Sequence, residues 1–298
     1  MKKIEKFSDF QNILLAMLYF TDDLCRKNDI KYTVMDGTLL GAVREGNMIA
    51  WDGDVDIALT HKEFEKLKKA FANYTGRYYL SYFPDHFYTK GKYYGLTHAR
   101  IIDKKASNPM LCIDVVTIDF LGDDYQAALD TVEEYIKINY AAERSISFHL
   151  PSVKKNKPFG VNFRNVLVTL LYPFFLLLSK ILTPKFKKRY SKFIKEKISY
   201  GEDSKYYTIE PYFNRFGVEE NDILKNGYID LPFSSFKVMA VANYETYLRK
   251  TYGDYRQLPP VEKRVPFPSE KELLNCKIEM DDELSSLLNR IKGENKHD

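Results

Sequence analysis

The sequence predicts an α/β fold in which a small mixed sheet is flanked by helices. Between residues 8 and 27, apolar side chains recur every three to four positions, which is the period of one face of a helix. Three later runs, 78–83, 95–103 and 111–120, are rich in β-branched and aromatic residues and are typical of strands. At 298 residues the chain is long enough for one large domain, or for one domain with an insertion.

Composition and charge restrict the class of partner. The formal net charge is only +4 at pH 7, so no global electrostatic field favours nucleic acid, and we expect none as a partner. Cys25, Cys112 and Cys276 are widely spaced and form no metal-binding or CxxC pattern, which indicates a reducing, cytoplasmic setting. The chain has no apolar run before Asp9, so we expect no signal peptide.

The chain is organised around residues 32–59, which predict a strand, a glycine turn, a short helix and a second strand. The first strand breaks at Asp36-Gly37, and the helix follows over 39–44. A glycine turn that opens a helix directly after a strand leaves backbone N–H groups free, and Thr38 adds a hydroxyl. Gly37 and Thr38 are therefore candidates for binding phosphate.

The second strand of this stretch, predicted over 54–59, carries two acidic side chains. Asp54 and Asp56 share one face, because strand side chains alternate with a period of two. Such a pair is tolerated either when it is solvated or when a cation lies between the carboxylates. A phosphate-binding turn followed closely by two carboxylates suits metal-assisted transfer of a phosphoryl-type group. We therefore treat both residues as candidate catalytic residues and metal ligands.

A third acidic residue, Asp114, lies between two aliphatic residues in a strand that should be largely buried. A lone buried carboxylate is costly unless it is paired. One explanation is an ion pair with a residue such as Arg100. The other is a place beside Asp54 and Asp56 as the third carboxylate of a divalent-metal site. The residues alone leave both explanations open.

A capping box over Thr60–Glu63 predicts that a helix begins directly after the second strand. His61, in the first turn of that helix, is expected to be exposed. Asp119 is expected to end the strand that contains Asp114, in a turn before a glycine. A further helix is predicted over 243–252, where Gly253 stops it.

Two stretches resemble signatures of the LicD family, which is similar in turn to the fukutin-related proteins. The first begins at Asp36 and reads DGTLLGAVREGNMIAWDGDVDIAL, and the second begins at Tyr247 and reads YLRKTYGDYRQLPPVEKR. Family members usually read WDDDxDI in the first stretch, where this chain has Gly53 between the acidic positions. The resemblance covers both ends of the fold but not the middle of the chain.

The resemblance implies a nucleotidyltransferase-like fold and a metal-dependent transferase. Such enzymes move phosphocholine or a similar phospho-substituent from a CDP-linked donor to a hydroxyl of a cell-surface glycan or its lipid-linked precursor. Asp54 and Asp56 would hold Mg²⁺ (or Mn²⁺) against the donor diphosphate, and Asp114 would complete the metal site and accept the proton of the acceptor. Two other functions stay open: transfer of a nucleotide to a protein or small molecule, and a non-catalytic membrane adaptor that retains the fold.

Two arginines are candidates for binding the donor phosphates. Arg44 ends the short helix, where a solvent-facing cation favoured by the helix dipole is the simple alternative. Arg100 lies within a predicted strand, so plain exposure to solvent is less automatic. The family has a basic residue near each position, which implies a phosphate contact for both.

The middle of the chain has a different composition. Residues 166–182 are almost entirely apolar and marginal for crossing a bilayer, which takes about 20 apolar residues, and a basic tract follows over 185–197. An apolar helix with a polybasic tract is typical of a segment that lies in an anionic membrane surface. A buried helical hairpin with a solvated basic face is the alternative. We expect a cytoplasmic protein, peripheral on the inner face of the cell membrane.

These patterns predict three parts of the chain. Residues 1–150 would form a nucleotidyltransferase-like catalytic core, and residues 151–200 an apolar and basic helical insert that associates with the membrane. Residues 201–298 would complete the same domain as the core.

Overall fold

The computed structural model describes residues 1–82, 99–108, 111–146, 159–198, 201–209, 217–266 and 276–293. By its internal contacts the chain divides into two units, which are described separately. The first comprises Met1–Ser81, Ala99–Asp119 and Glu220–Asp298, and the second comprises Tyr82–His98 and Phe120–Glu219.

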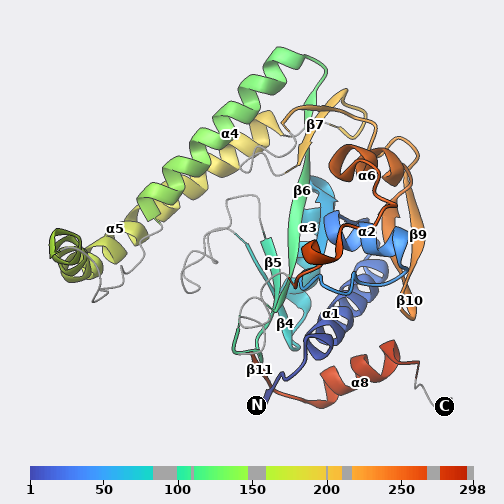
Figure 1. Cartoon of the computed structure of the whole chain (residues 1–298). Coiled ribbons are helices and arrows are strands. Elements are labelled where there is room, and N and C mark those ends of the chain that lie inside the picture. Colours follow the sequence, from blue (N-terminus) through green and yellow to red (C-terminus); the bar gives the residue numbers. More distant parts are fainter. Residues whose placement is uncertain are drawn as a thin grey trace. The chain divides into compact units, whose positions relative to one another are not determined.

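The first unit is built on a mixed sheet (Figure 1). Its strands lie in the order β2 (Thr33–Val34), β3 (Asp56–Thr60), β6 (Cys112–Gly122), β5 (Ala99–Asp103) and β4 (Tyr78–Ser81). β3 and β6 run parallel, and the other neighbouring pairs are antiparallel. The strands predicted between 78 and 120 are all present, so the expectation of a mixed sheet flanked by helices is confirmed.

Helices cover this sheet and pack on one another. α1 (Phe7–Lys27) confirms the first predicted helix, and α8 (Asp282–Ile291) packs against it (Figure 1). α2 (Asp36–Arg44) and α3 (His61–Asn73) pack against β3. The hydroxyl of Thr60 accepts a hydrogen bond from the backbone N–H of Glu63, so the predicted cap of α3 is confirmed.

Two small antiparallel pairs complete the first unit. β9 (Tyr228–Phe233) pairs with β10 (Phe236–Val241), and β1 (Lys2–Lys3) pairs with β11 (Lys277–Ile278). α6 (Tyr244–Tyr252) ends at Gly253, whose φ of 66° is a left-handed conformation that glycine adopts without a steric cost. The predicted stop of this helix is therefore confirmed. A 3₁₀ turn, η3 (Val261–Lys263), follows in the same unit.

Two element boundaries in the organising stretch differ from the prediction. α2 begins at Asp36 rather than at 39, because the N–H of Leu39 already bonds to the carbonyl oxygen of Met35 at 3.0 Å. β3 begins at Asp56 rather than at 54, because the N–H of Asp56 bonds to the Thr38 side chain. Asp54 therefore precedes the strand on whose face it was predicted.

The expectations for His61 and Asp119 were wrong. Asp119 lies inside β6, fully buried, because β6 continues to Gly122. Its carboxylate accepts a hydrogen bond from the hydroxyl of Thr117 at 3.2 Å and lies 3.3 Å from Nδ1 of His61. The His61 side chain is only 24% exposed as a result of this pairing.

The second unit contains a helical hairpin of α4 (Tyr125–Ile146) and α5 (Phe159–Lys197), with β7 (Tyr206–Ile209) (Figure 1). The two-residue strand β8 (Glu219–Glu220) spans the sequence boundary between the two units. α5 continues through Pro173 and Pro184. The two helices share an apolar core made of Leu121, Ala128, Val132, Tyr135, Ile138, Phe193, Ile198 and Tyr206. Among the described residues, no helix is long and apolar enough to cross a bilayer.

Candidate functional site

Three adjacent strands of the first unit carry charged residues side by side. Asp56 of β3 lies opposite Asp114 of β6, and Arg100 of β5 lies opposite Asp114 on its other side. Residues that are directly opposite in a sheet point to the same face, so the three side chains form one row. The sheet thus brings together three of the residues that the sequence predicted as site residues.

Asp114 and Arg100 form an ion pair. Nε of Arg100 donates to Oδ1 of Asp114 at 2.6 Å, and Nη2 lies 3.5 Å from Oδ2. The two side chains are only 8% and 17% exposed, which strengthens the interaction relative to a surface pair. The ion pair that the sequence left open is therefore present. Asp114 nevertheless still interacts with the other carboxylates. Burial raises the pKa of Asp54 and of Asp56, and the negative charge of Asp114 raises both pKa values further.

The carboxylates of this region act on one another. Burial, and then a hydrogen bond with Asp54, raise the pKa of Asp52 to about 9. Burial raises the pKa of Asp56 well above its usual value, and the charges of Asp54, Asp114 and Asp36 raise it further. The charged neighbours with the largest effect on the pKa of Asp56 are acidic, so a cation bound among these side chains would relieve their repulsion.

Asp36 belongs to this acidic group, although in the sequence it marks only the break after a strand. Its φ of 46° places it in the left-handed region, which is uncommon for a residue other than glycine. The hydroxyl of Tyr247 donates a hydrogen bond of 2.8 Å to Oδ1 of Asp36. Strained backbone of this kind costs on the order of 1–3 kcal/mol and is often found at functional sites. In the sequence, the position of Asp36 directly before Gly37 was the feature that could have identified it as a site residue.

Gly37 and Thr38 contact the acidic residues directly. Oγ1 of Thr38 accepts a hydrogen bond of 2.9 Å from the backbone N–H of Asp56. A Cβ atom at Gly37 would collide with the carboxylate of Asp52, so only glycine fits there without a shift. The two candidates for phosphate binding therefore lie in the first turn of α2, beside the acidic side chains.

A single side chain of α1 holds the loop that carries Asp52. Nε2 of Gln11 donates to the carbonyl oxygens of Ile49 and Asp52, at 2.9 and 2.8 Å. Gly41 of α2 lets the same loop approach closely, because a Cβ at this position would meet the carbonyl oxygen of Asn47. The loop is therefore fixed from two sides.

Arg44 does not face solvent, as it would if it were only a surface cation at the end of α2. Its side chain is 11% exposed, and its guanidinium pairs with Glu45 at 2.8 Å. Nη1 of Arg44 also lies 3.5 Å from the carbonyl oxygen of Tyr255, which belongs to the second stretch that resembles the LicD family, residues 247–264, named here the closing motif. The guanidinium of Arg264, at the end of the same motif, lies 5.6 Å from the ring centroid of Trp51. The closing motif thus packs around the loop and helix of the site.

The donor set fits a hard divalent cation only in part. Within the described part of the chain, no three His, Cys, Asp or Glu side chains are arranged to hold a metal ion. Mg²⁺, however, is usually bound by one or two carboxylates together with substrate phosphates rather than by an all-protein cage. Asp54 and Asp56 supply two carboxylates of that kind, and the repulsion around Asp56 favours a cation there.

Comparison with known proteins places this site in a family. Residues 29–124 match the family described as LicD/FKTN/FKRP, nucleotidyltransferase domain. The matched range includes Asp56, Asp114 and Arg100, and it also includes Asp36.

Relatives extend the similarity beyond that domain. The chain is 24% identical over 282 residues to the lipopolysaccharide cholinephosphotransferase LicD of Haemophilus influenzae, which covers 89% of this chain and 97% of the relative. Shorter matches of 50 residues, 44% identical, cover 17% of this chain and 19% of an uncharacterized protein of Rickettsia prowazekii. A similar protein of Rickettsia typhi matches to the same extent, over 16% of its length. The chain therefore carries a nucleotidyltransferase domain of the LicD/FKTN/FKRP type, and over most of its length it is similar to a LicD phosphotransferase.

Proposed function

We propose that the chain transfers a phospho-substituent of the phosphocholine type from a CDP-linked donor to a hydroxyl of a cell-surface glycan or its lipid-linked precursor. The row of Asp56, Asp114 and Arg100 is the observation that carries this proposal. Carboxylates suit a divalent cation and a guanidinium suits a phosphate, and a diphosphate donor needs both. The name of the Haemophilus influenzae relative, a lipopolysaccharide cholinephosphotransferase, supports this choice of donor and acceptor.

In the proposed reaction, the oxygen of the acceptor hydroxyl attacks the phosphorus that carries the alcohol. A new P–O bond forms, and the bond from that phosphorus to the bridging oxygen of the diphosphate breaks. Cytidine monophosphate leaves with the electron pair of the broken bond. The hydroxyl proton passes to a carboxylate of the site, for which Asp114 is our candidate. Phosphoryl transfer depends mainly on positioning and charge stabilisation, for which side chains on a sheet are well suited.

Asp54 and Asp56 would hold Mg²⁺ (or Mn²⁺) against the donor diphosphate, with Asp114 as the third carboxylate. When bound, the ion neutralises phosphate charge and polarises the phosphorus–oxygen bonds. Asp36 adds negative charge to the same group, which favours cation binding, and a bound cation would lower the raised pKa of Asp52.

Arg100 and Arg44 are proposed to bind the donor phosphates. A guanidinium carries its N–H donors in a planar fork that matches phosphate oxygens. Arg100 lies in the row itself, and Arg44 ends the helix whose first turn contains Gly37 and Thr38. The N-terminal turn of that helix would contribute backbone N–H groups to the same phosphates.

We further propose that α5 associates with the cytoplasmic face of the cell membrane, where a lipid-linked acceptor would lie. Large apolar side chains on α5 are 43% to 73% exposed and recur at helical spacing: Leu170, Leu171, Phe174, Leu177 and Ile181. A buried hairpin, the alternative left open by the sequence, would cover these side chains. Exposed cations of the basic tract follow on the same helix, and they include Lys185, Lys188 and Arg189.

The proposed donor class is tested by calorimetry with CDP-choline, CDP-ethanolamine and CDP-glycerol, each with and without Mg²⁺. Binding of one CDP-alcohol that requires Mg²⁺ and exceeds that of CDP alone would support the proposal. Preferred binding of a nucleoside triphosphate, with release of pyrophosphate, would favour nucleotide transfer instead. A protein that binds neither Mg²⁺ nor any donor would be the non-catalytic adaptor.

A further inference from the structure

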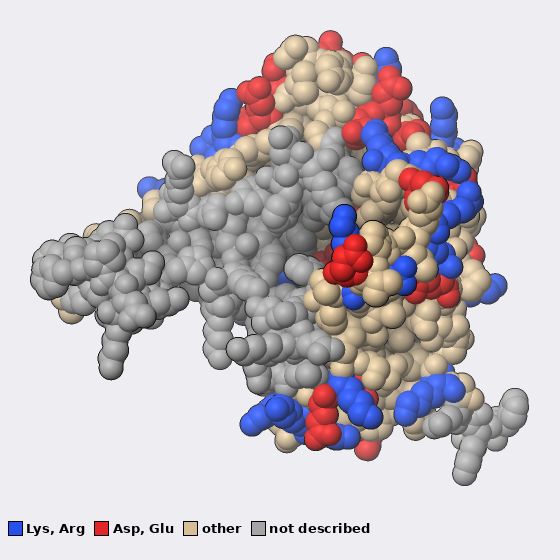
Figure 2. Space-filling view, in the orientation of Figure 1, with Lys and Arg blue, Asp and Glu red and all other residues tan. Residues whose placement is uncertain are grey.

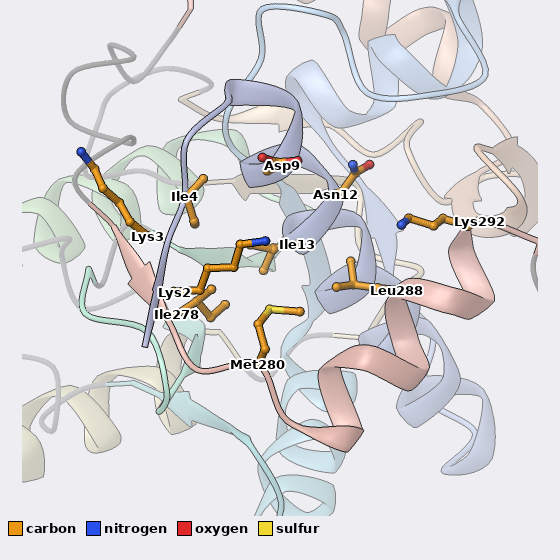
Figure 3. A pocket seen from close by; sticks show the side chains of 10 residues that line it. All are labelled: Lys2, Lys3, Ile4, Asp9, Asn12, Ile13, Ile278, Met280, Leu288 and Lys292. Carbon is orange, nitrogen blue, oxygen red and sulfur yellow. The ribbon is translucent and has the colours of Figure 1, made fainter.

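A cavity of about 200 Å³ lies in the first unit, and none of the acidic site residues lines it (Figure 3). Its walls come from the N-terminal segment, α1, β11 and α8. An apolar cavity of roughly 150 Å³ is large enough to bind benzene. This cavity therefore has room for a small apolar group or for the end of an alkyl chain.

The floor of the cavity is aliphatic. Ile4, Ile13 and Ile278 line it and are buried, with 2% to 5% of their surface exposed. Leu288 of α8 is half-buried, and Met280 is 44% exposed at the same cavity. Methionine is flexible and polarisable, so it adapts to apolar ligands of irregular shape. A partly open aliphatic floor of this kind favours an alkyl chain over a polar ligand.

The rim of the cavity is basic. Lys2 and Lys3 of β1 and Lys292 after α8 line it, and all three are exposed. Among the described residues that line it, these lysines face one acidic side chain, that of Asp9. Within the part of the chain that the structure describes, none of the three lysines forms an ion pair. Basic side chains, with acidic ones among them, lie along the lower edge of the surface in Figure 2, where Figure 1 places the N-terminus, β11 and α8.

We propose that this cavity binds one alkyl chain that ends in an anionic head group, as in a fatty acid. The aliphatic floor would take the chain, and the ammonium groups of Lys2 and Lys292 would contact the head group, whereas the ammonium group of Lys3 points away from the cavity (Figure 3). A cationic amphiphile would meet the same floor but a repulsive rim. A small anion without a chain would gain only the contacts with exposed lysines, which are weak.

The cavity and the acidic site share the start of α1. Asn12 and Ile13 line the cavity, while the adjacent Gln11 holds the carbonyl oxygens of Ile49 and Asp52. A ligand in the cavity therefore rests on the same helical turn that fixes the site loop.

The test is calorimetry on the full chain with decanoate, kept below its critical micelle concentration. Decyltrimethylammonium has the same chain with the opposite charge, and acetate has the head group alone. We expect decanoate to bind at least about tenfold more tightly than either, because only decanoate satisfies both floor and rim. Equal affinity for the two amphiphiles would overturn the role of the lysines, and no detectable binding of decanoate would overturn the proposal.

Variants separate the rim from the floor. Replacing Lys2 and Lys292 together with glutamine should weaken decanoate binding about tenfold, since exposed ion pairs each contribute little. The matched control replaces two exposed lysines outside the cavity, Lys62 and Lys237, with glutamine and should leave binding unchanged. Leu288→Phe should fill the floor and abolish binding with the melting temperature retained. Decanoate binding that persists in a folded Leu288→Phe variant would place the ligand elsewhere.

Discussion

The hydroxyl of Tyr247 donates a 2.8 Å hydrogen bond to the carboxylate of Asp36, although 211 positions separate the two residues. Tyr247 belongs to the closing motif, and Asp36 opens the helix of the acidic site. The bond therefore joins the two stretches that resemble the same family, and it does so at a residue with a left-handed backbone.

Tyr247→Phe should lower the free energy of unfolding by about 0.5–1.5 kcal/mol, the usual contribution of one hydrogen bond. It should also reduce turnover, because Asp36 loses the contact that orients its carboxylate. Urea unfolding and a transfer assay measure the two effects. Tyr244→Phe, on the same helix, is the matched control. If both variants behave alike, the bond to Asp36 has no particular role.

Asp56→Asn should reduce turnover by a factor on the order of 10² or more, as expected for loss of a group that stabilises transition-state charge. Asp54→Asn should act in the same direction. Without a divalent cation, either variant should melt at the same or a higher temperature than the wild type, because a neutral amide removes repulsion.

Added Mg²⁺ should raise the melting temperature of the wild type and not that of Asp56→Asn. Asp23→Asn, on the surface of α1, is the control and should keep the response to Mg²⁺. Near-normal turnover in Asp56→Asn would remove this residue from the metal site.

Arg44→Ala should weaken binding of the CDP-linked donor by about 1.5–3 kcal/mol, the range for hydrogen bonds to charged groups. Calorimetry at a fixed Mg²⁺ concentration measures the change. Arg249→Ala, in the closing motif and more exposed, controls for the general loss of positive charge. An unchanged donor affinity would mean that Arg44 only connects α2 to Glu45 and Tyr255.

Binding to anionic vesicles should fall with rising salt but not vanish. Each basic residue near an anionic surface contributes about 1 kcal/mol, which salt screens, whereas burial of the apolar side chains of α5 is insensitive to salt. A variant with four glutamines in the basic tract should lose most of the salt-sensitive part: Lys185, Lys187, Lys188 and Arg189. Phe174→Ser should weaken the rest.

Vesicle sedimentation measures both effects. Equal binding to neutral and anionic vesicles would discard the electrostatic contribution. If the chain binds neither kind of vesicle, the proposed membrane role of α5 is wrong.

The pair of His61 and Asp119 should make stability depend on pH. Burial disfavours the charged imidazole, but the hydrogen bond to Asp119 and its charge outweigh this and raise the pKa of His61. The stabilisation is therefore complete below the pKa of an unfolded histidine, about 6.5, and is lost as pH rises through the higher folded pKa. Urea unfolding from pH 6 upward measures the loss. His61→Asn should lack this component, and an unchanged pH dependence would assign it to other groups.

Local pattern was enough to predict the strands that carry Asp114 and Arg100, but not the register that aligns these residues with Asp56. Asp114 and Arg100 lie in strands whose composition is unambiguous, and a partner for a buried carboxylate follows from its cost. The place of Asp36 and the burial of Arg44 were missed, because both depend on Tyr247 and Tyr255, which are distant in sequence.

Element boundaries failed for a related reason. β6 extends past Asp119, where the acidic residue and the following glycine favoured a turn. The tertiary contacts of Asp119 with Thr117 and His61 override that local preference.

The amide of Gln11 leaves little freedom for substitution at its position. It has two N–H hydrogens, and the two carbonyl oxygens that it reaches, those of Ile49 and Asp52, can accept both. Glutamate has the same length but no donor, so it would place a negative charge against two oxygen atoms and close to an already acidic loop. Asparagine keeps the donors but is one methylene shorter. The conformation of the loop that carries Asp52 thus depends on the length and polarity of one neutral side chain, which belongs to α1.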